Sequence, residues 1–353
     1  MRPKPFVAAA VAVCASLLVA CGSPEPPEGS PKEVTVTLMT HDSFNVSEPV
    51  LDAFRDETGI TVEVLTGGDA GAALNQAILS KDNPVADVFY GVDNTFLARA
   101  LDAGIFQEYT PAAVSEVPAE LRLDTSGRLT PIDYADVCVN ADDATLAKTA
   151  TPAPADLESL TDPRYKGDLV VENPATSSPG LAFLLATIAE FGPDGWQRYW
   201  EALRANGVKV VDGWESAYFT EFSAGGAGGS RPLVVSYATS PVATVVDADP
   251  PVDRATTSVA AQTCFRQVEL AGVLDGTRVP GPARRVVDFL LSQQFQADMP
   301  LQMYVYPARA GIPLPQVFVD NAAVVEHPHS IPPAEIAAHR DEWIDAWKQV
   351  TLG

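Results

Sequence analysis

The chain has 353 residues, with 23 Lys and Arg against 46 Asp and Glu, which gives a formal net charge of −23. The length predicts about two domains, since single cores stop growing at roughly 250–300 residues, and 46% hydrophobic residues exclude intrinsic disorder. The acidic balance argues against nucleic acid as a partner, because binding phosphates requires Lys and Arg. It mildly favours a cationic partner.

The first segment of the chain is typical of an exported protein. Two basic residues precede an apolar run over residues 6–20 that is too short to span a membrane. The run ends in Leu-Val-Ala-Cys followed by Gly-Ser, which resembles a bacterial lipoprotein lipobox. We therefore predict a signal peptide over residues 1–20, a lipidated Cys21 that anchors the chain outside the cell membrane, and a Pro-rich tether over residues 21–32. An ordinary secretory peptide with a chance cysteine is the alternative.

Removal of this signal peptide would change both the charge and the cysteine count. Without its two basic residues the chain has 21 basic against 46 acidic residues, a net charge of −25. With Cys14 removed and Cys21 lipidated, Cys138 and Cys264 remain. An even count in an oxidising compartment predicts a disulfide between them, and two buried free thiols are the alternative.

After the tether, strands and helices alternate. The β-branched run Val34–Thr40 predicts a buried strand, and apolar residues at helical spacing predict a helix over Glu48–Thr58 that ends at Gly59. The alternation continues with predicted strands over residues 60–65 and 86–90 and predicted helices over residues 70–80 and 95–103. This order predicts a parallel sheet covered by helices.

Polar residues follow each of these three strands, over residues 41–44, 66–71 and 91–94. Ligands of parallel α/β sheets lie beyond the carboxyl ends of the strands, so these segments are candidates for a binding site. Two of them carry glycine, which permits a close approach of the backbone.

A second α/β block extends over residues 133–237. Its predicted strands cover residues 168–172, 208–211 and 232–237, and a helix covers residues 181–191. The Gly-rich stretch over residues 224–230 lacks the Gly-x-x-x-x-Gly-Lys pattern of a phosphate loop and is predicted to be a surface loop. An amphipathic helix is predicted from Pro333 onward.

Short motifs are spread over the chain from about residue 34 to its end, among them Asp-Ser-Phe at residues 42–44 and Trp-Glu-Ser-Ala-Tyr at residues 214–218. With these motifs the chain resembles ABC-transporter solute-binding proteins specific for thiamine. Tyr-Lys-Gly at residues 165–167 and Thr-Ser-Ser-Pro-Gly at residues 176–180 are shared with ferric-ion and polyamine binders. Three others point to thiamine: Asp-Ser-Phe at residues 42–44, Trp-Glu-Ser-Ala-Tyr at residues 214–218 and Ser-Tyr-Ala-Thr-Ser-Pro at residues 236–241.

The resemblance implies an α/β, two-lobed periplasmic-binding-protein fold of type II-like topology. Each lobe would be a mostly parallel sheet flanked by helices, and hinge crossovers would lie near residues 133–134 and 237–241. The implied lobes cover residues 33–134 with 240–300, and residues 135–239 with 301–353. The implied protein is a monomer without cofactor or resident metal.

The resemblance also implies a set of ligand-binding residues. Trp214 would stack on thiamine, Tyr237 and Ser177 would contact its hydroxyl or phosphate end, and Asp69 would accept a hydrogen bond. Tyr304 falls where relatives carry a stacking tryptophan. The full implied set is His41, Asp69, Ser177, Trp214, Tyr218, Tyr237 and Tyr304.

Two positions differ from relatives that carry tyrosine there, namely His41 and Ala243. These differences leave open the preference among thiamine and its phosphates.

Each site residue also has a structural interpretation. On spacing alone Trp214 fits a core position as well as a ligand contact. Asp93 and Asp133 fit helix caps or backbone acceptors better than ligand contacts, and Ser177 fits the cap of the following helix.

Three classes of function are therefore compared. The favoured one is a lipid-anchored receptor that closes two lobes on thiamine or its phosphates and delivers it to an ABC permease. The second is the same fold with ferric ion or a polyamine as ligand. The third is an exported hydrolase, which the sequence disfavours because it lacks the Gly-x-Ser-x-Gly, His-Glu-x-x-His and Ser-x-x-Lys motifs.

Overall fold

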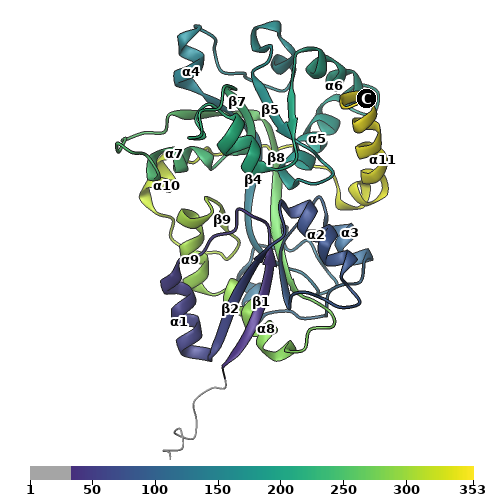
Figure 1. Cartoon of the computed structure of the whole chain (residues 1–353), viewed down its shortest axis with the longest axis vertical. Helices are drawn as coiled ribbons and strands as arrows, with labels where there is room; N and C mark the ends of the chain where they lie inside the picture. The colour runs from purple at the N-terminus through teal and green to yellow at the C-terminus, as the bar shows by residue number, and fades with distance from the viewer. Residues whose placement is uncertain (1–32) are drawn as a thin grey trace, which may run out of the picture. The chain divides into compact units, whose positions relative to one another are not determined.

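A single nine-stranded sheet organises residues 33–353, the part of the chain that the computed structural model describes (Figure 1). The strand order is β2-β1-β3-β8-β4-β7-β5-β6, and β9 pairs with β4. The predicted signal peptide, Cys21 and the tether lie outside the described residues. The strands are β1 Val34–Thr40, β2 Ile60–Thr66, β3 Val88–Asp93, β4 Thr130–Asp142, β5 Leu169–Glu172, β6 Lys209–Val211, β7 Leu233–Tyr237, β8 Thr257–Val273 and β9 Tyr306–Pro307.

One end of the sheet, which we call the first lobe, has the predicted parallel order β2-β1-β3. β1 is buried through side chains such as Val36 and Leu38. Helix α1 ends at Gly59, whose φ of 71° is left-handed and therefore suits glycine. These strand and helix predictions are confirmed. The helices of this lobe are α1 Glu48–Thr58, α2 Ala70–Leu79, α3 Leu97–Asp102, α8 Pro280–Leu290 and α9 Gln293–Gln302.

The other end of the sheet, the second lobe, has the order β7-β5-β6 with parallel pairing. Helix α5 is apolar on every side and buried along most of its length, as the continuous apolar run predicts. Its helices are α4 Asp143–Lys148, α5 Ser178–Phe191, α6 Trp196–Ala205, α7 Ala243–Val246, α10 Gln316–Asn321 and α11 Pro333–Thr351, the last being the amphipathic helix predicted near the end of the chain.

Two long antiparallel strands, β4 and β8, run through both lobes (Figure 1). β8 pairs with β3 in the first lobe, and β4 pairs with β7 in the second. Neither strand was predicted from the sequence. β8 mixes Gln, Thr, Arg and Glu with apolar residues and shows no regular alternation. The second passage between lobes therefore follows β8, whereas the sequence predicted it near residues 237–241.

The predicted disulfide joins these two long strands. Cys138 on β4 and Cys264 on β8 are bonded across a sequence separation of 126 residues, and both are fully buried. They lie where the pairing of β4 with β8 shifts register between Val137 and Val139. The bond therefore ties the strands together where their ladder is interrupted.

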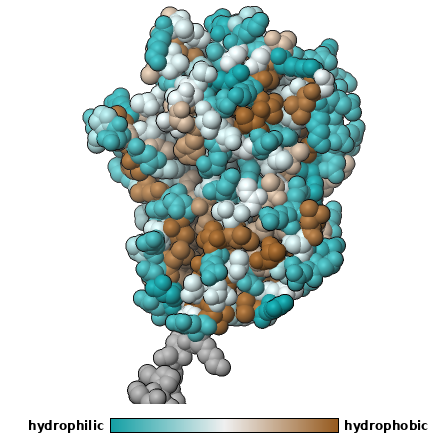
Figure 2. All heavy atoms as spheres, in the orientation of Figure 1, coloured by the Kyte–Doolittle hydropathy of each residue, from teal (hydrophilic) through white to brown (hydrophobic). Residues whose placement is uncertain are grey.

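The surface of the described residues is mixed in character. Figure 2 shows hydrophilic residues along much of the rim of one face and hydrophobic residues gathered across the lower half of the view. Within residues 33–353 none of the helices combines the length and the hydrophobicity that crossing a membrane requires.

Candidate functional site

A cavity of about 580 Å³ lies between the two lobes. Its size is typical of a small-molecule site. The first lobe contributes the segment after β1 and the end of α9, and the second contributes the segments after β6 and β7. The shared strands β4 and β8 contribute the floor, through Asp133, Ala135, Gln267 and Glu269. The segments after β1, β6 and β7 follow the ends of parallel strands, as the parallel topology predicts.

Aromatic side chains form much of the cavity wall. The indole of Trp214 packs parallel to the ring of Tyr218, with 5.0 Å between the ring centres. Its Nε1–H donates to Ser236 Oγ at 2.9 Å, which fixes the plane of the ring. The aromatic lining residues are Phe44, Trp214, Tyr218, Phe219, Tyr237 and Tyr304. Such a wall suits a flat ligand, above all a cationic one.

The charged residues of the cavity are almost all acidic. His41 is the single basic residue among those that line it within residues 33–353, and neither Lys nor Arg does so. The acidic lining residues are Asp42, Asp133, Glu215, Asp247 and Glu269. A ligand with a positive charge is favoured in such surroundings, and an anion is repelled.

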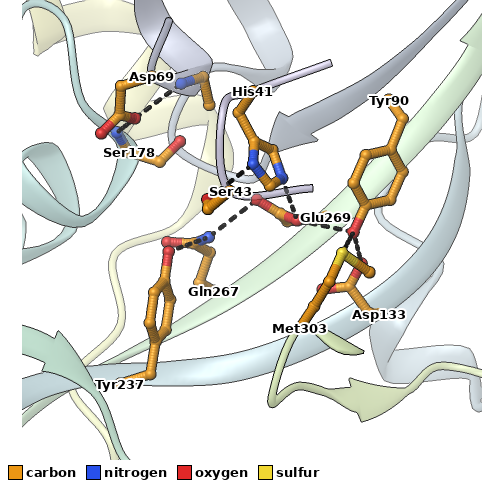
Figure 3. Close-up of polar contacts among 11 residues, drawn as sticks. His41, Ser43, Asp69, Tyr90, Asp133, Ser178, Tyr237, Gln267, Glu269 and Met303 are labelled. Carbon is orange, nitrogen blue, oxygen red and sulfur yellow. Dashed lines mark hydrogen bonds and ion pairs between the residues drawn. The ribbon is translucent and has the colours of Figure 1, made fainter. Parts of the chain in front are cut away.

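Two buried carboxyl groups share the hydroxyl of Tyr90 at the cavity floor (Figure 3). The Tyr90 Oη lies 3.0 Å from Glu269 Oε2 and also hydrogen-bonds to Asp133. Burial, followed by the negative charge of Glu269, raises the pKa of Asp133 well above its usual value. A tyrosine hydroxyl has one proton for two carboxyl groups, so a proton on Asp133 satisfies the cluster.

His41 supplies the countercharge for Glu269. The His41 Nε2 lies 3.5 Å from Glu269 Oε2, and its Nδ1 lies 2.9 Å from Ser43 Oγ. Burial lowers the pKa of His41, but the charge of Glu269, its hydrogen bond to the ring and the charges of Asp69 and Asp42 together outweigh burial and raise the pKa overall. Burial raises the pKa of Glu269, and the charge of His41 with several hydrogen bonds lowers it overall. Both shifts favour a buried ion pair between the two side chains.

The structure brings five of the seven predicted ligand-binding residues to the cavity: His41, Trp214, Tyr218, Tyr237 and Tyr304. Ala243, the second position that differs from relatives, also lines it. Tyr304 has a left-handed backbone with φ of 55°, and its hydroxyl donates to Asp247 Oδ2 at 3.0 Å. A left-handed backbone is uncommon for a bulky residue and is often found at functional sites.

Asp69 and Ser177 have other partners and are not among the described residues that line the cavity. Asp69 accepts hydrogen bonds from the backbone N–H groups of Ala70, Ser178 and Trp214. Ser177 caps α5 through the N–H of Gly180 at 3.4 Å, which is the structural role that the sequence also offered. Their contact with a ligand stays a prediction.

Sequence reasoning missed the polar floor of the cavity. Glu269 and Gln267 lie on β8, which was not predicted as a strand, and Tyr90 is an interior residue of β3. Gln267 Nε2 donates to Glu269 Oε1 at 3.2 Å and reaches Tyr237 Oη at 3.5 Å. The alternation of Gln267 and Glu269 on one face of a strand was the available signal.

Asp93, the last residue of β3, binds neighbouring backbone N–H groups, which is one of the two structural roles that the sequence offered. It does not cap α3, whose N-cap residue is Phe96. Its burial has a measurable consequence. Asp93 accepts from the N–H groups of Thr95 and Phe96, and burial raises its pKa to about 6. A carboxyl group with a raised folded-state pKa stabilises the protein fully at low pH, and this stabilisation is lost as the pH rises through about 6. Asp93→Asn should therefore gain about 2–3 kcal/mol of stability relative to the unaltered protein between pH 4 and 7.

Urea unfolding of both proteins at pH 4, 5, 6 and 7 would measure this difference. Asp82→Asn, at an exposed loop position, is the matched control and should change the stability by less than about 0.5 kcal/mol. A stability difference between Asp93→Asn and the unaltered protein that stays the same from pH 4 to pH 7 would contradict the assignment.

Within residues 33–353 no cluster of His, Cys, Asp or Glu has three members placed to hold a metal ion. The cavity combines an aromatic wall with an acidic floor. It offers a carboxylate–histidine pair and several hydroxyl and amide groups as polar partners.

Comparison with known proteins gives a family match over most of the chain. The model of the family described as bacterial extracellular solute-binding protein matches residues 83–340. The thiamine-binding periplasmic protein of Escherichia coli K12 is 29% identical over 344 residues, which cover 95% of this chain and 98% of the relative. The protein of the same name from Brucella suis is 29% identical over 330 residues, which cover 90% of this chain and 92% of the relative.

Solved structures agree on the fold. A periplasmic thiamin binding protein superposes with a TM-score of 0.79 and 27% identity, covering 93% of this chain and 99% of the other. A ferric binding protein from Campylobacter jejuni has a TM-score of 0.71 with 18% identity, covering 89% of this chain and 99% of the other. The second likeness supports the two-lobed α/β fold alone.

Proposed function

The chain belongs to the bacterial extracellular solute-binding protein family, and we propose that it captures thiamine in the cavity between its lobes and delivers it to an ABC permease. Family membership makes the chain a binding protein and not an enzyme. The predicted α/β periplasmic-binding-protein fold is confirmed by the solved structures. Thiamine as the ligand of this chain is the part that we propose.

The composition of the cavity lining carries this proposal. Thiamine joins an aminopyrimidine to a cationic thiazolium with a hydroxyethyl tail. A flat cation is held best against aromatic faces, with an attraction of about 0.5–2 kcal/mol for each ring. The cavity offers six aromatic side chains together with acidic ones, and neither Lys nor Arg from the described residues lines it.

The relatives support the same ligand. Proteins named for thiamine binding match nearly the full length of this chain, and the solved thiamin binding protein has a TM-score of 0.79. In our proposal Trp214 and Tyr304 form facing parts of the aromatic wall, and His41, Tyr218 and Tyr237 complete the contacts with the ligand. Asp69 and Ser177 would support the site from behind the wall.

We further propose that the two lobes close on the ligand by bending along β4 and β8, which is the usual motion of two-lobed receptors. The protein would act as a monomer tethered through a lipid on Cys21. The lipobox pattern supports the tether, and metabolic labelling of the full chain with a radioactive fatty acid would test it. A chain without label would contradict lipidation.

Titration of the purified protein with thiamine, spermidine and Fe(III) tests the function. Thiamine should quench tryptophan fluorescence, because Trp214 lies in the cavity wall, and it should raise the thermal unfolding midpoint by mass action. Spermidine and Fe(III) should do neither. A response to Fe(III) or to spermidine without one to thiamine would contradict the proposal and favour the corresponding alternative receptor.

A further inference from the structure

A hydrogen bond between Tyr304 and Asp247 joins the two lobes. Tyr304 follows α9 in the first lobe, and Asp247 follows α7 in the second. The Tyr304 hydroxyl donates to Asp247 Oδ2 at 3.0 Å. Figure 1 shows α7 and α9 toward the left of the view, away from α2 and α5. Both residues line the cavity, so the hydrogen bond connects the lobes along one side of the ligand space.

The backbone of Tyr304 has a conformation that is unusual for tyrosine. Met303 is the C-cap residue of α9, and a left-handed residue directly after a C-cap is most often glycine. Tyr304 occupies this position with φ of 55°. Bulky residues in such conformations gather at ligand clamps and switch regions. The turn after α9 would suit glycine, so the presence of tyrosine points to a role for its side chain.

The Tyr304 hydroxyl keeps its proton beside the carboxylate. Burial, followed by the negative charge of Asp247 and the hydrogen bond to it, raises the pKa of Tyr304 above its usual value. A carboxylate can only accept, so the hydroxyl is the donor. Hydrogen bonds to a charged acceptor are roughly twice as strong as those between neutral groups. The contact is therefore of the stronger kind.

The Asp247 carboxylate is held in place by the second lobe. The N–H of Asp247 donates to the carbonyl of Ala243 at 2.9 Å, at the end of α7. Ala243 lines the cavity one helical turn earlier, so this face of α7 points toward the ligand space. The chain beyond is tied back to α7, where the N–H of Thr256 donates to Thr244 Oγ1 at 3.2 Å. Asp247 can therefore hold Tyr304 only while α7 lies next to the end of α9.

The hydrogen bond lies on the solvent side of the cavity. Asp247 is exposed and Tyr304 is half-buried. In contrast, Asp133 and Glu269 at the cavity floor are buried. Opening of a two-lobed receptor moves the lobes apart about their hinge. This motion would separate Tyr304 from Asp247, so release of a ligand from the floor requires the hydrogen bond to break.

We propose that Tyr304 is a positioning residue whose hydroxyl latches the lobes together through Asp247 and slows the release of the ligand. This inference rests on the proposed function. A contact made only in the closed arrangement stabilises that arrangement and not the open one that a ligand enters. Loss of the hydroxyl should therefore raise the dissociation rate constant and leave the association rate constant nearly unchanged. This role of the hydroxyl is separate from the contact of the ring with the ligand.

Stopped-flow fluorescence with thiamine would measure both rate constants. Tyr304→Phe keeps the ring and removes the hydroxyl. It should raise the dissociation rate constant about three- to tenfold and change the association rate constant by less than about twofold. Asp247→Ala should raise the dissociation rate constant by a similar factor. In the Tyr304→Phe background Asp247→Ala should add less than about twofold, because the two groups act through one hydrogen bond.

Two matched variants control for the loss of a hydroxyl and of a carboxylate. Tyr306→Phe alters a half-buried tyrosine two residues after Tyr304, and Asp253→Ala alters an exposed aspartate in the segment after α7. Neither position is among the described residues that line the cavity. Both variants should keep both rate constants within about twofold of the original. The thermal unfolding midpoint of each variant without ligand shows whether it is folded.

The outcomes separate this inference from the proposed function. If thiamine binds and Tyr304→Phe releases it as slowly as Tyr306→Phe does, the function stands and the latch is wrong. Effects of Tyr304→Phe and Asp247→Ala that multiply independently would also overturn the latch. If Tyr304→Phe does not fold, the dissociation rate constants of Asp247→Ala and Asp253→Ala decide in the same way.

A measurement without ligand tests the latch if thiamine does not bind the unaltered protein, in which case the proposed function is wrong. Small-angle X-ray scattering would then compare Tyr304→Phe with Tyr306→Phe. The loss of the latch should open the lobes more often and give Tyr304→Phe the larger radius of gyration. Equal radii would overturn the inference.

Discussion

Trp214→Ala should weaken the binding of thiamine by about 30- to 100-fold. Trp214 lies in the cavity wall, stacks on Tyr218 and is oriented by a hydrogen bond to Ser236. Its removal would delete one face of the aromatic wall and its attraction for the thiazolium cation. Buried aromatic anchors of this kind typically contribute about 2 kcal/mol or more to binding, and each 1.4 kcal/mol is tenfold in affinity. Isothermal titration calorimetry would measure the loss.

A second tryptophan provides the control for this experiment. Trp343 lies half-buried on α11 and is not among the residues that line the cavity. Trp343→Ala should leave the dissociation constant for thiamine within about twofold of the original, since distant sites act independently. Trp214→Phe keeps an aromatic face and should lose less affinity than the alanine variant. If Trp214→Ala binds thiamine as tightly as Trp343→Ala does, Trp214 is a packing residue and not a ligand contact.

The double variant Cys138→Ala, Cys264→Ala should lose about 2–5 kcal/mol of unfolding free energy. The disulfide closes a loop of 126 residues, and cross-links of long loops restrict the unfolded chain most strongly. It also joins β4 and β8 where their register shifts, so no regular ladder compensates for its loss. Urea unfolding followed by circular dichroism would measure the change. The midpoint should fall, while the slope should change because the unfolded chain becomes less compact.

Reduction of the unaltered protein separates the cross-link from the packing of the sulfur atoms. Both cysteines are fully buried, so alanine also removes buried volume, whereas reduction removes only the bond. The reduced protein should therefore lose most of the stability that the double variant loses. A midpoint that does not move on reduction would show that the bond does not stabilise the folded state.

The local elements could be predicted from the sequence because their signals lie within a few residues. β1 is a short β-branched run, α1 ends at a glycine in the left-handed conformation, and α5 is a continuous apolar segment. Of the polar segments predicted as candidates for a binding site, the one over residues 41–44 lines the cavity, whereas those over residues 66–71 and 91–94 are not among its lining residues. For these features the physical cause is short in range: periodicity, capping and the carboxyl ends of parallel strands.

The long strands and the polar floor could not be predicted in the same way. β8 carries Gln267 and Glu269 within an irregular polar pattern, and its role depends on pairing with β4 more than a hundred residues away. Nothing in the local sequence distinguishes Tyr90 from an ordinary strand residue. The pairing of β3 with β8 brings its hydroxyl against the carboxyl group of Glu269. Side chains so far apart in the chain meet only through the sheet, so no local pattern records their contact.

By itself the sequence determined the export signal pattern, the α/β class, the pair of cysteines and the family resemblance, because these depend on composition, short-range periodicity and motif order. The tertiary structure alone decided what the polar residues do. It placed Asp69 on the α5 N-terminus and left the cavity lined by aromatic and acidic groups. The net charge of −23 indicated a cationic partner only weakly. Charges select a ligand through their distance and burial at the site, and the fold sets both.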